Sequence, residues 1–203
     1  MLIKDQKIYT SGMMEEVSRC KKALELAGNG ETVTVVSSGD PGVYGMAGLI
    51  LELNKNKQLE IEIVPGVSAV NAAASLLGAP LSHDFAVISL SDLLTSWEII
   101  EKRIKCAAEG DFVIAIYNPK SKRRVSQIIN ARDITLKYRS GTTPVGIVTN
   151  AYREKQSIVL SNLKDFADED INMLSVVIIG NSQTVLDKGR LITPRGYQSK
   201  YQV

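Results

Sequence analysis

Two segments in the first third of the chain share one order: a β-branched run, a loop rich in glycine or proline, and a helical pattern of apolar residues. Thr32 to Val36 leads through the loop 37–42, Ser-Ser-Gly-Asp-Pro-Gly, into apolar positions spaced for a helix. Glu60 to Val64 leads through Pro-Gly-Val-Ser-Ala into a helix of small residues at 70–77. Repetition of strand, loop and helix predicts parallel strands, because parallel neighbours need a crossover connection. An α/β fold is therefore expected.

The second half of the sequence predicts a mixed sheet. Strands are expected at 85–90, 112–117, 144–149, 157–160 and 175–179. Helical patterns that begin at Trp97 and at Arg123 lie between the earlier strands, and parallel pairing requires such connections. The loop 150–156 suits an antiparallel hairpin better than a crossover.

Gly78-Ala79-Pro80 interrupts the pattern, and residues 81–84 are the expected linker. We therefore expect an N-terminal α/β domain at residues 1–82, with a parallel sheet. A C-terminal α/β domain with a mixed sheet is expected at residues 83–203.

Composition excludes several classes of protein. The 203 residues include 24 basic and 22 acidic residues, so the chain lacks the excess of positive charge that is typical of a general nucleic-acid binder. Cys20 and Cys106 form no CxxC pair and belong to no Cys/His metal cluster, so reduced thiols, a cytoplasmic protein and no bound metal are expected. No apolar run is long enough to span a bilayer and no signal peptide is recognisable, which predicts a protein without a membrane partner.

The loop 37–42 lies where open α/β sheets bind ligands, beyond the carboxyl end of a strand. Gly39 and Gly42 permit positive φ and close approach of a ligand to the backbone, and Asp40 can accept hydrogen bonds from a ribose hydroxyl or an ammonium group. The alternative is a plain turn in which Asp40 caps the next helix. Ser68 occupies the equivalent place in the second loop, and two such loops favour a shared ligand crevice. Neither loop carries a P-loop or a dinucleotide fingerprint.

A cluster of cations follows the strand expected at 112–117. Lys120, Lys122, Arg123 and Arg124 stand together at a helix start, where the helix dipole disfavours positive charge. A binding patch for substrate carboxylates or phosphates explains the cluster, and a solvated helix face is the alternative.

His83 is the single histidine and lies in the expected linker. A structural role, with Asp84 or backbone as its partner, is one interpretation. A general base or a metal ligand at a domain junction is the other.

Several longer stretches resemble the tetrapyrrole methylase family. They are VSSGDPGVYGMAGL, IVPGVSAVNAAASLLGAPLSHDFAVISLSDLLTSWEIIEKRI, AIYNPKSKRR and ITPRGY, and together they run from about Ser11 to Tyr197. The block LGAPLSHDFAVISLSDLLT is similar to the family branch that methylates C17 of precorrin-3B or cobalt-factor III. That resemblance implies methylation with ring contraction in cobalamin biosynthesis.

The resemblance also implies two α/β domains, a homodimer, and S-adenosylmethionine bound in the cleft between the domains. Matching the family's contact loops residue by residue assigns the cofactor to Ser38, Gly39, Asp40, Val43, Ser68, Ala69, Asn118 and Ala151. The carboxylates of a tetrapyrrole substrate imply clamps at Lys120, Lys122, Arg123, Arg124 and Arg195. His83 is the expected base for the ring contraction, and Asp40 is expected to orient the cofactor.

One departure from the family pattern leaves alternatives open. Family members begin with a strand, a Gly-Pro-rich loop and a helix, a unit on the order of 30 residues, and we expect this chain to lack that unit. A non-catalytic module that binds S-adenosylmethionine or a tetrapyrrole is therefore one alternative, and a tetrapyrrole methylase of different regiospecificity is another. A methylase of RNA or protein is disfavoured by the branch-specific block and by the absence of a broad basic face.

Overall fold

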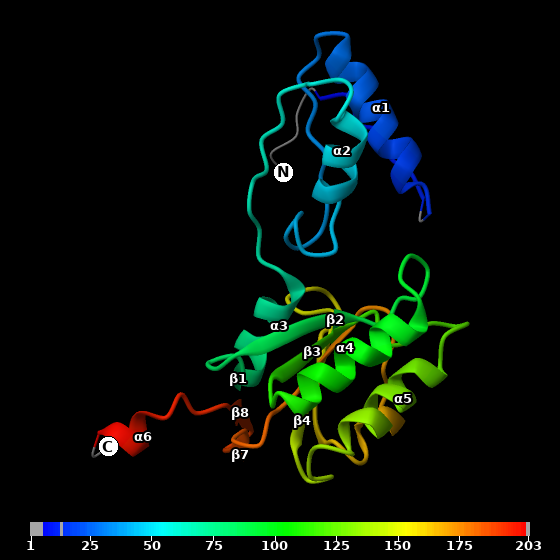
Figure 1. Cartoon of the computed structure of the whole chain (residues 1–203). Coiled ribbons are helices and arrows are strands. Elements are labelled where there is room, and N and C mark those ends of the chain that lie inside the picture. The colour runs from blue at the N-terminus through cyan, green and yellow to red at the C-terminus, as the bar shows by residue number, and fades with distance from the viewer. Residues whose placement is uncertain (1–5, 13, 202–203) are drawn as a thin grey trace. The chain divides into compact units, whose positions relative to one another are not determined.

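The structure is a computed structural model of the chain, and it describes residues 6–12 and 14–201. Its contacts divide the chain into two compact units, residues 1–68 (unit 1) and 69–203 (unit 2), which are described separately (Figure 1). The domain boundary expected after residue 82 stays a prediction.

The described part of unit 1 contains two helices that pack on each other, α1 (Glu16–Gly28) and α2 (Ala47–Asn54). Cys20 and Leu24 on α1 lie one turn apart and share a buried cluster with Ile50 of α2, as the helical periodicity requires. Gly30 has a φ of 89°, and its N–H donates to the Ala27 carbonyl just beyond the end of α1. This hydrogen bond and the positive φ end the helix at the Gly28-Asn29-Gly30 turn.

The two strands expected in unit 1 are not formed among the described residues. Segments 32–36 and 60–64 are irregular in the structure and share no ladder. Val35 and Ile61 nevertheless pack against the α1–α2 cluster, whereas Val36 and Val64 are 79% and 67% exposed. The β-type periodicity is present in these segments, but a strand also needs a hydrogen-bonded neighbour, which local sequence does not provide.

Unit 2 contains the sheets and the remaining helices. Its elements are α3 (Ala69–Leu77), β1 (Gly78–Ala79), β2 (Phe85–Ser89), α4 (Trp97–Glu109), β3 (Val113–Tyr117), α5 (Ser126–Thr135), β4 (Pro144–Thr149), β5 (Ser157–Asn162), the 3₁₀ turn η1 (Phe166–Asp168), β6 (Ser175–Ile179), β7 (Val185–Asp187), β8 (Arg190–Ile192) and α6 (Tyr197–Lys200). None of the helices described in the chain is both long enough and apolar enough to cross a membrane.

The larger sheet has the strand order β2-β3-β6-β4-β5, and β1, β8 and β7 form a smaller one. β2 and β3 pair in parallel, while the β3–β6, β6–β4 and β4–β5 pairs are antiparallel. The predicted mixed sheet is therefore confirmed, including the hairpin of β4 and β5.

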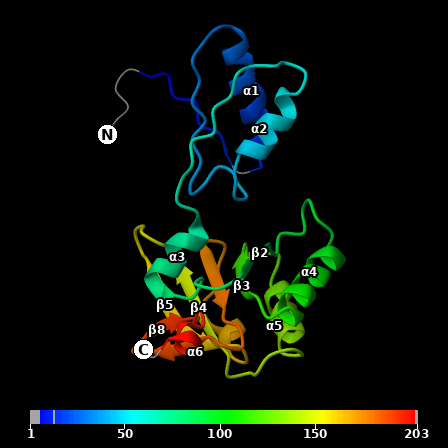
Figure 2. The same ribbon diagram turned by 60° about the vertical axis from the view of Figure 1, so that its left-hand side comes forward.

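Both faces of the larger sheet are covered, which is why its central strand β3 is apolar from Val113 to Ile116. Ile114 and Ile116 of β3 belong to the cluster beneath α4 and α5, whereas Val113 and Ala115 belong to the cluster beneath α3. Figure 2 shows α3 on one side of this sheet and α4 and α5 on the other. Side chains that alternate between two buried faces produce a continuous hydrophobic run.

The strand directions gather several loops at one edge. β2, β3 and β4 run the same way and β6 runs against them, so the carboxyl ends of the first three strands meet the start of β6. We call this the carboxyl edge of unit 2. The start of α3 lies there too, because the Val70 N–H donates to the Tyr117 hydroxyl over 2.7 Å.

Candidate functional site

In unit 1 the Asp40 carboxylate holds two loops together. Its Oδ1 accepts from the Gly42 N–H at 2.8 Å, and its Oδ2 accepts from the Gly66 N–H at 3.0 Å. These backbone donors, that of Gly66 first, lower the pKa of Asp40 below its ordinary value. Asp40 does not cap α2, whose N-cap is Met46, so the plain-cap alternative does not describe this residue.

The same two loops approach each other so closely that glycine is required. A Cβ on Gly66 would overlap the carbonyl group of Gly39, which itself has a φ of 78°. Such a conformation suits glycine because other residues clash there. Gly39 and Gly66 are both exposed, so their backbone is open to close approach by a bound group.

The other cofactor residues predicted in unit 1 lie in these loops. Ser38 and Val43 are exposed, and the Val43 N–H donates to the Asp40 carbonyl at 3.2 Å. Ser68 is only 6% exposed, and Ala69 begins α3 directly after it. The structure therefore brings Ser38, Gly39, Asp40 and Val43 together with the Pro-Gly-Val-Ser loop in a single unit, and their contact with a cofactor stays a prediction.

Asn118 and Ala151 lie at the carboxyl edge of unit 2. Asn118 follows β3 with a φ of 49°, and its Nδ2 donates to Ser89 Oγ at 2.9 Å. Ala151 follows Asn150, which also has a positive φ and donates its N–H to the Leu174 carbonyl. Two strand-end loops with left-handed asparagines thus meet at the edge where open sheets bind ligands.

The predicted cation cluster divides into exposed and buried members. Lys122 and Arg123 are exposed and Lys120 is half-buried, but Arg124 is only 8% exposed. The Arg124 guanidinium contacts protein groups instead of solvent. Ser89 and Asp92, which contact Asn118 and Arg124, were not predicted, although they lie within the branch-specific block.

His83 and Arg195 are not brought to the carboxyl edge. His83 lies just before the start of β2. Arg195 lies at the same end, because its Nη1 donates to the Ser82 carbonyl at 3.4 Å. Asn118 follows the opposite end of the parallel β2–β3 pair. A five-residue strand spans about 16 Å. The Nδ1 of His83 accepts from the Asp84 N–H at 2.8 Å. This is the partner expected if His83 has a structural role. The role of His83 as a base stays a prediction.

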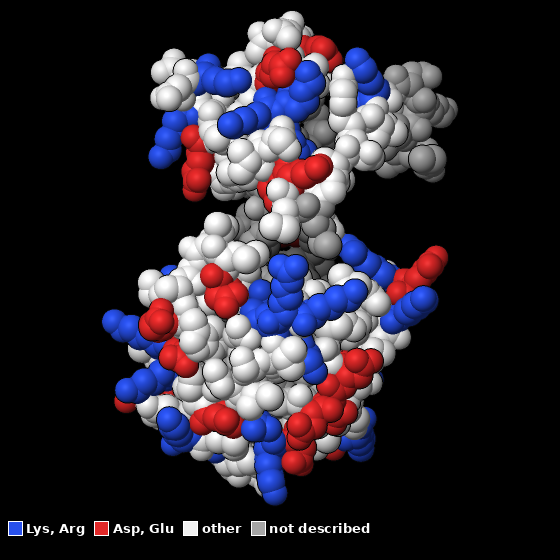
Figure 3. Space-filling model, turned by 90° about the vertical axis from the view of Figure 1, so that its right-hand side faces the viewer, with Lys and Arg blue, Asp and Glu red and all other residues white. Residues whose placement is uncertain are grey.

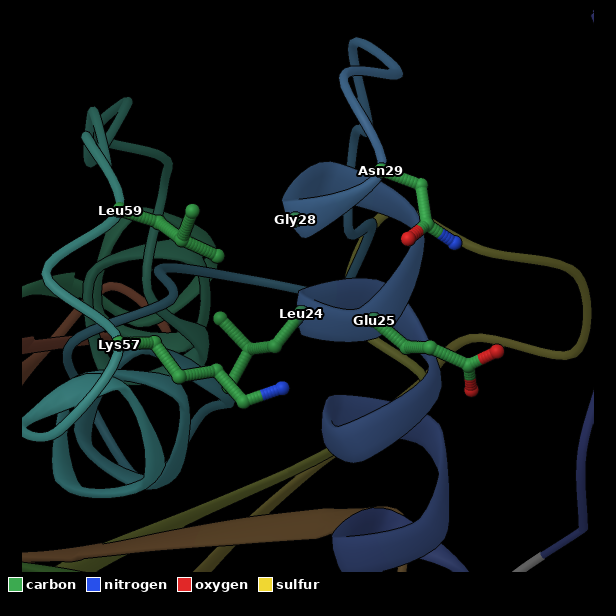
Figure 4. A pocket seen from close by; sticks show the side chains of 6 residues that line it. All are labelled: Leu24, Glu25, Gly28, Asn29, Lys57 and Leu59. Carbon is green, nitrogen blue, oxygen red and sulfur yellow. The ribbon is translucent and has the colours of Figure 1, made fainter.

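A pocket of about 400 Å³ lies in unit 1 beside the end of α1 (Figure 4). Leu24 points from α1 toward Lys57 and Leu59, whereas Glu25 and Asn29 point away from them. The pocket has no convergent polar groups and contains none of the predicted site residues, so it does not form the candidate site.

The charge on one face of the molecule and the grouping of metal-binding side chains were compared with the candidate site. Figure 3 shows a face on which basic and acidic side chains are interspersed, with one local group of Lys and Arg. Within residues 6–12 and 14–201, no three His, Cys, Asp or Glu side chains are grouped to hold a metal ion.

Comparison with known proteins matches residues 3–167 to the model for tetrapyrrole (corrin/porphyrin) methylases. A "Cobalt-factor III methyltransferase" of Priestia megaterium is 54% identical over 98% of this chain, which spans only 38% of that relative. A "Probable cobalt-factor III C(17)-methyltransferase" of Salmonella typhimurium is 50% identical over 95% of this chain and 81% of its own length. The crystal structure of the methyltransferase CobJ superposes with a TM-score of 0.87 at 38% identity, covering 92% of this chain and 80% of that one.

Proposed function

This chain belongs to the tetrapyrrole methylase family, and we propose that it methylates C17 of a corrinoid precursor with ring contraction in cobalamin biosynthesis. The observation that carries this proposal is the similarity, over nearly the whole chain, to relatives named for methylation of cobalt-factor III. Because those names specify the cobalt form, we favour cobalt-factor III over metal-free precorrin-3B as the substrate. The same resemblance supports a cytoplasmic homodimer.

When bound, S-adenosylmethionine supplies a methyl group that its sulfonium already activates, so the chain has mainly to orient donor and acceptor and exclude water. The loops of unit 1 joined by Asp40 expose the backbone of Gly39 and Gly66, which supports their use as cofactor contacts. Asn118 and Ala151 at the carboxyl edge supply the contacts proposed in unit 2. Asp40 orients the cofactor by holding its loop, since both of its oxygens already accept backbone hydrogen bonds.

The tetrapyrrole substrate carries several carboxylates, which require cationic partners. Lys122 and Arg123 support this role because they are exposed beside the loop of Asn118. Lys120 is a half-buried third candidate. Ring contraction also needs removal of a proton from a ring hydroxyl, and His83 is the residue proposed for it.

The test is incubation of the purified protein with S-adenosylmethionine and cobalt-factor III, followed by mass spectrometry and absorption spectroscopy. We expect a product one methyl group heavier, with the spectrum of a contracted ring and the new methyl at C17 by NMR. A methyl at another carbon would indicate a methylase of different regiospecificity. Binding of both ligands without any product would indicate a non-catalytic module.

A further inference from the structure

The buried Arg124 joins three loops at the carboxyl edge of unit 2. Its Nη2 donates to the Asn118 carbonyl at 3.0 Å and to Met173 Sδ at 3.6 Å, and its Nη1 lies 3.9 Å from Asp92 Oδ1. These partners lie in the loops after β3, before β6 and after β2, respectively. One guanidinium therefore holds the ends of three different strands.

Asn118 is held at both of its polar ends. Arg124 bonds its carbonyl, while its side-chain amide donates to Ser89 Oγ at 2.9 Å. A φ of 49° is uncommon outside glycine, and surrounding contacts must hold such a conformation in place. These two hydrogen bonds are suited to that task.

Asp92 extends the network to helix α5 and to an apolar loop. Its Oδ2 accepts from Gln127 Nε2 at 3.1 Å, while its Oδ1 faces Arg124. The next residues, Leu93 and Leu94, are 75% and 100% exposed. The position of this loop and that of Asn118 thus depend on the same guanidinium.

The burial of Arg124 argues against a role in packing alone. A buried cation is costly to desolvate, and its Nε finds no acceptor among the described residues. An apolar side chain would fill the same space at lower cost, but only a planar guanidinium can hold several acceptors in a fixed geometry.

We propose that Arg124 is a positioning residue for the methyl-transfer site, which fixes the Asn118 backbone and the Asp92 loop instead of binding a substrate carboxylate. The identity of the ligand positioned rests on the proposed function. The arrangement of the loops does not, because every contact lies within unit 2.

The experiment compares Arg124→Met and Arg124→Lys with the wild type and with Arg103→Met, a control at an exposed arginine on α4. Hydrogen–deuterium exchange at residues 118–124 is measured without ligand, and titration gives the Kd of S-adenosylhomocysteine. Arg124→Met should speed exchange in this loop and raise the Kd about tenfold or more, the scale of a lost charged hydrogen bond. Arg124→Lys should recover part of both effects, because an ammonium can still bond to one acceptor.

Unchanged exchange and a Kd within twofold of the wild type in folded Arg124→Met would overturn the proposal. So would weaker binding of the tetrapyrrole alone, which would make Arg124 a substrate clamp. If Arg124→Met does not fold, Asp92→Asn at the partly exposed end of the network replaces it, with the same readouts and a smaller expected effect. If the wild type binds no S-adenosylhomocysteine, the proposed function fails, and the exchange comparison still decides the role of Arg124.

Discussion

Gly66 donates its backbone N–H to Asp40 Oδ2 over 3.0 Å, although the two residues are 26 positions apart. This hydrogen bond joins the first glycine loop to the Pro-Gly-Val-Ser loop within unit 1. Neither loop follows a paired strand there, so the Asp40 side chain fixes the spacing that a sheet would otherwise set. The geometry of the candidate cofactor loops therefore depends on the charge of one carboxylate.

The first prediction concerns the pH dependence of this contact. Because the pKa of Asp40 lies below its ordinary value, its hydrogen bonds stabilise the folded loops at neutral pH, and this stabilisation is lost as the pH falls through the lowered pKa. The amide resonance of Gly66 should report this transition in an NMR titration, at a pH below the usual carboxyl range. Asp40→Asn should abolish the transition, and its persistence in that variant would assign it to another carboxylate.

The second prediction is that Gly66→Ala disrupts the loop pair. The added Cβ would overlap the Gly39 carbonyl, and such overpacking costs about 1–3 kcal/mol. Binding of S-adenosylmethionine, measured by calorimetry, should weaken at least about tenfold. Gly48→Ala is the matched control, because a Cβ there meets nothing within 4 Å and alanine favours the helix. Equal losses in both variants would contradict the role of the close approach.

The third prediction separates the substrate from the cofactor. Reversing the charge of the exposed pair with Lys122→Glu and Arg123→Glu should weaken tetrapyrrole binding by several-fold to about tenfold, as expected for exposed charges. Binding of S-adenosylmethionine should be unchanged, and the loss should shrink at high salt. Fluorescence quenching on titration with the tetrapyrrole measures the first effect. Equal weakening of tetrapyrrole binding and of S-adenosylmethionine binding would indicate misfolding.

The fourth prediction tests His83 as the base. A base role requires that His83→Ala retain cofactor affinity and lose most of its turnover, by about 100-fold or more. We expect this loss of turnover, although His83 lies at the opposite end of β2 from the Asn118 loop. Steady-state rates of methyl transfer decide between the two outcomes. Unchanged turnover would remove His83 from the mechanism and leave its contact with Asp84 as its role.

Local sequence predicted most of the elements of unit 2, because each one carries its own periodicity. The helix at α3, the hairpin of β4 and β5 and the buried strand β6 all lie where their patterns place them. The sequence also predicted that the loop of Asn118 follows a strand, but not that Ser89 and Asp92 lie beside it. It could not supply neighbours for 32–36 and 60–64, because pairing depends on residues far away in the chain.

Arg123 and Arg124 show how far the sequence alone predicts the candidate site. The two residues are adjacent and chemically identical, and the sequence determined that a cationic cluster follows β3 near a candidate ligand loop. Their environments differ because of the fold: Arg123 faces solvent, while Arg124 is buried against Asn118, Asp92 and Met173. Burial of Arg124 depends on segments 32 and 49 residues away, those of Asp92 and Met173, and no local sequence pattern records which distant segments pack together.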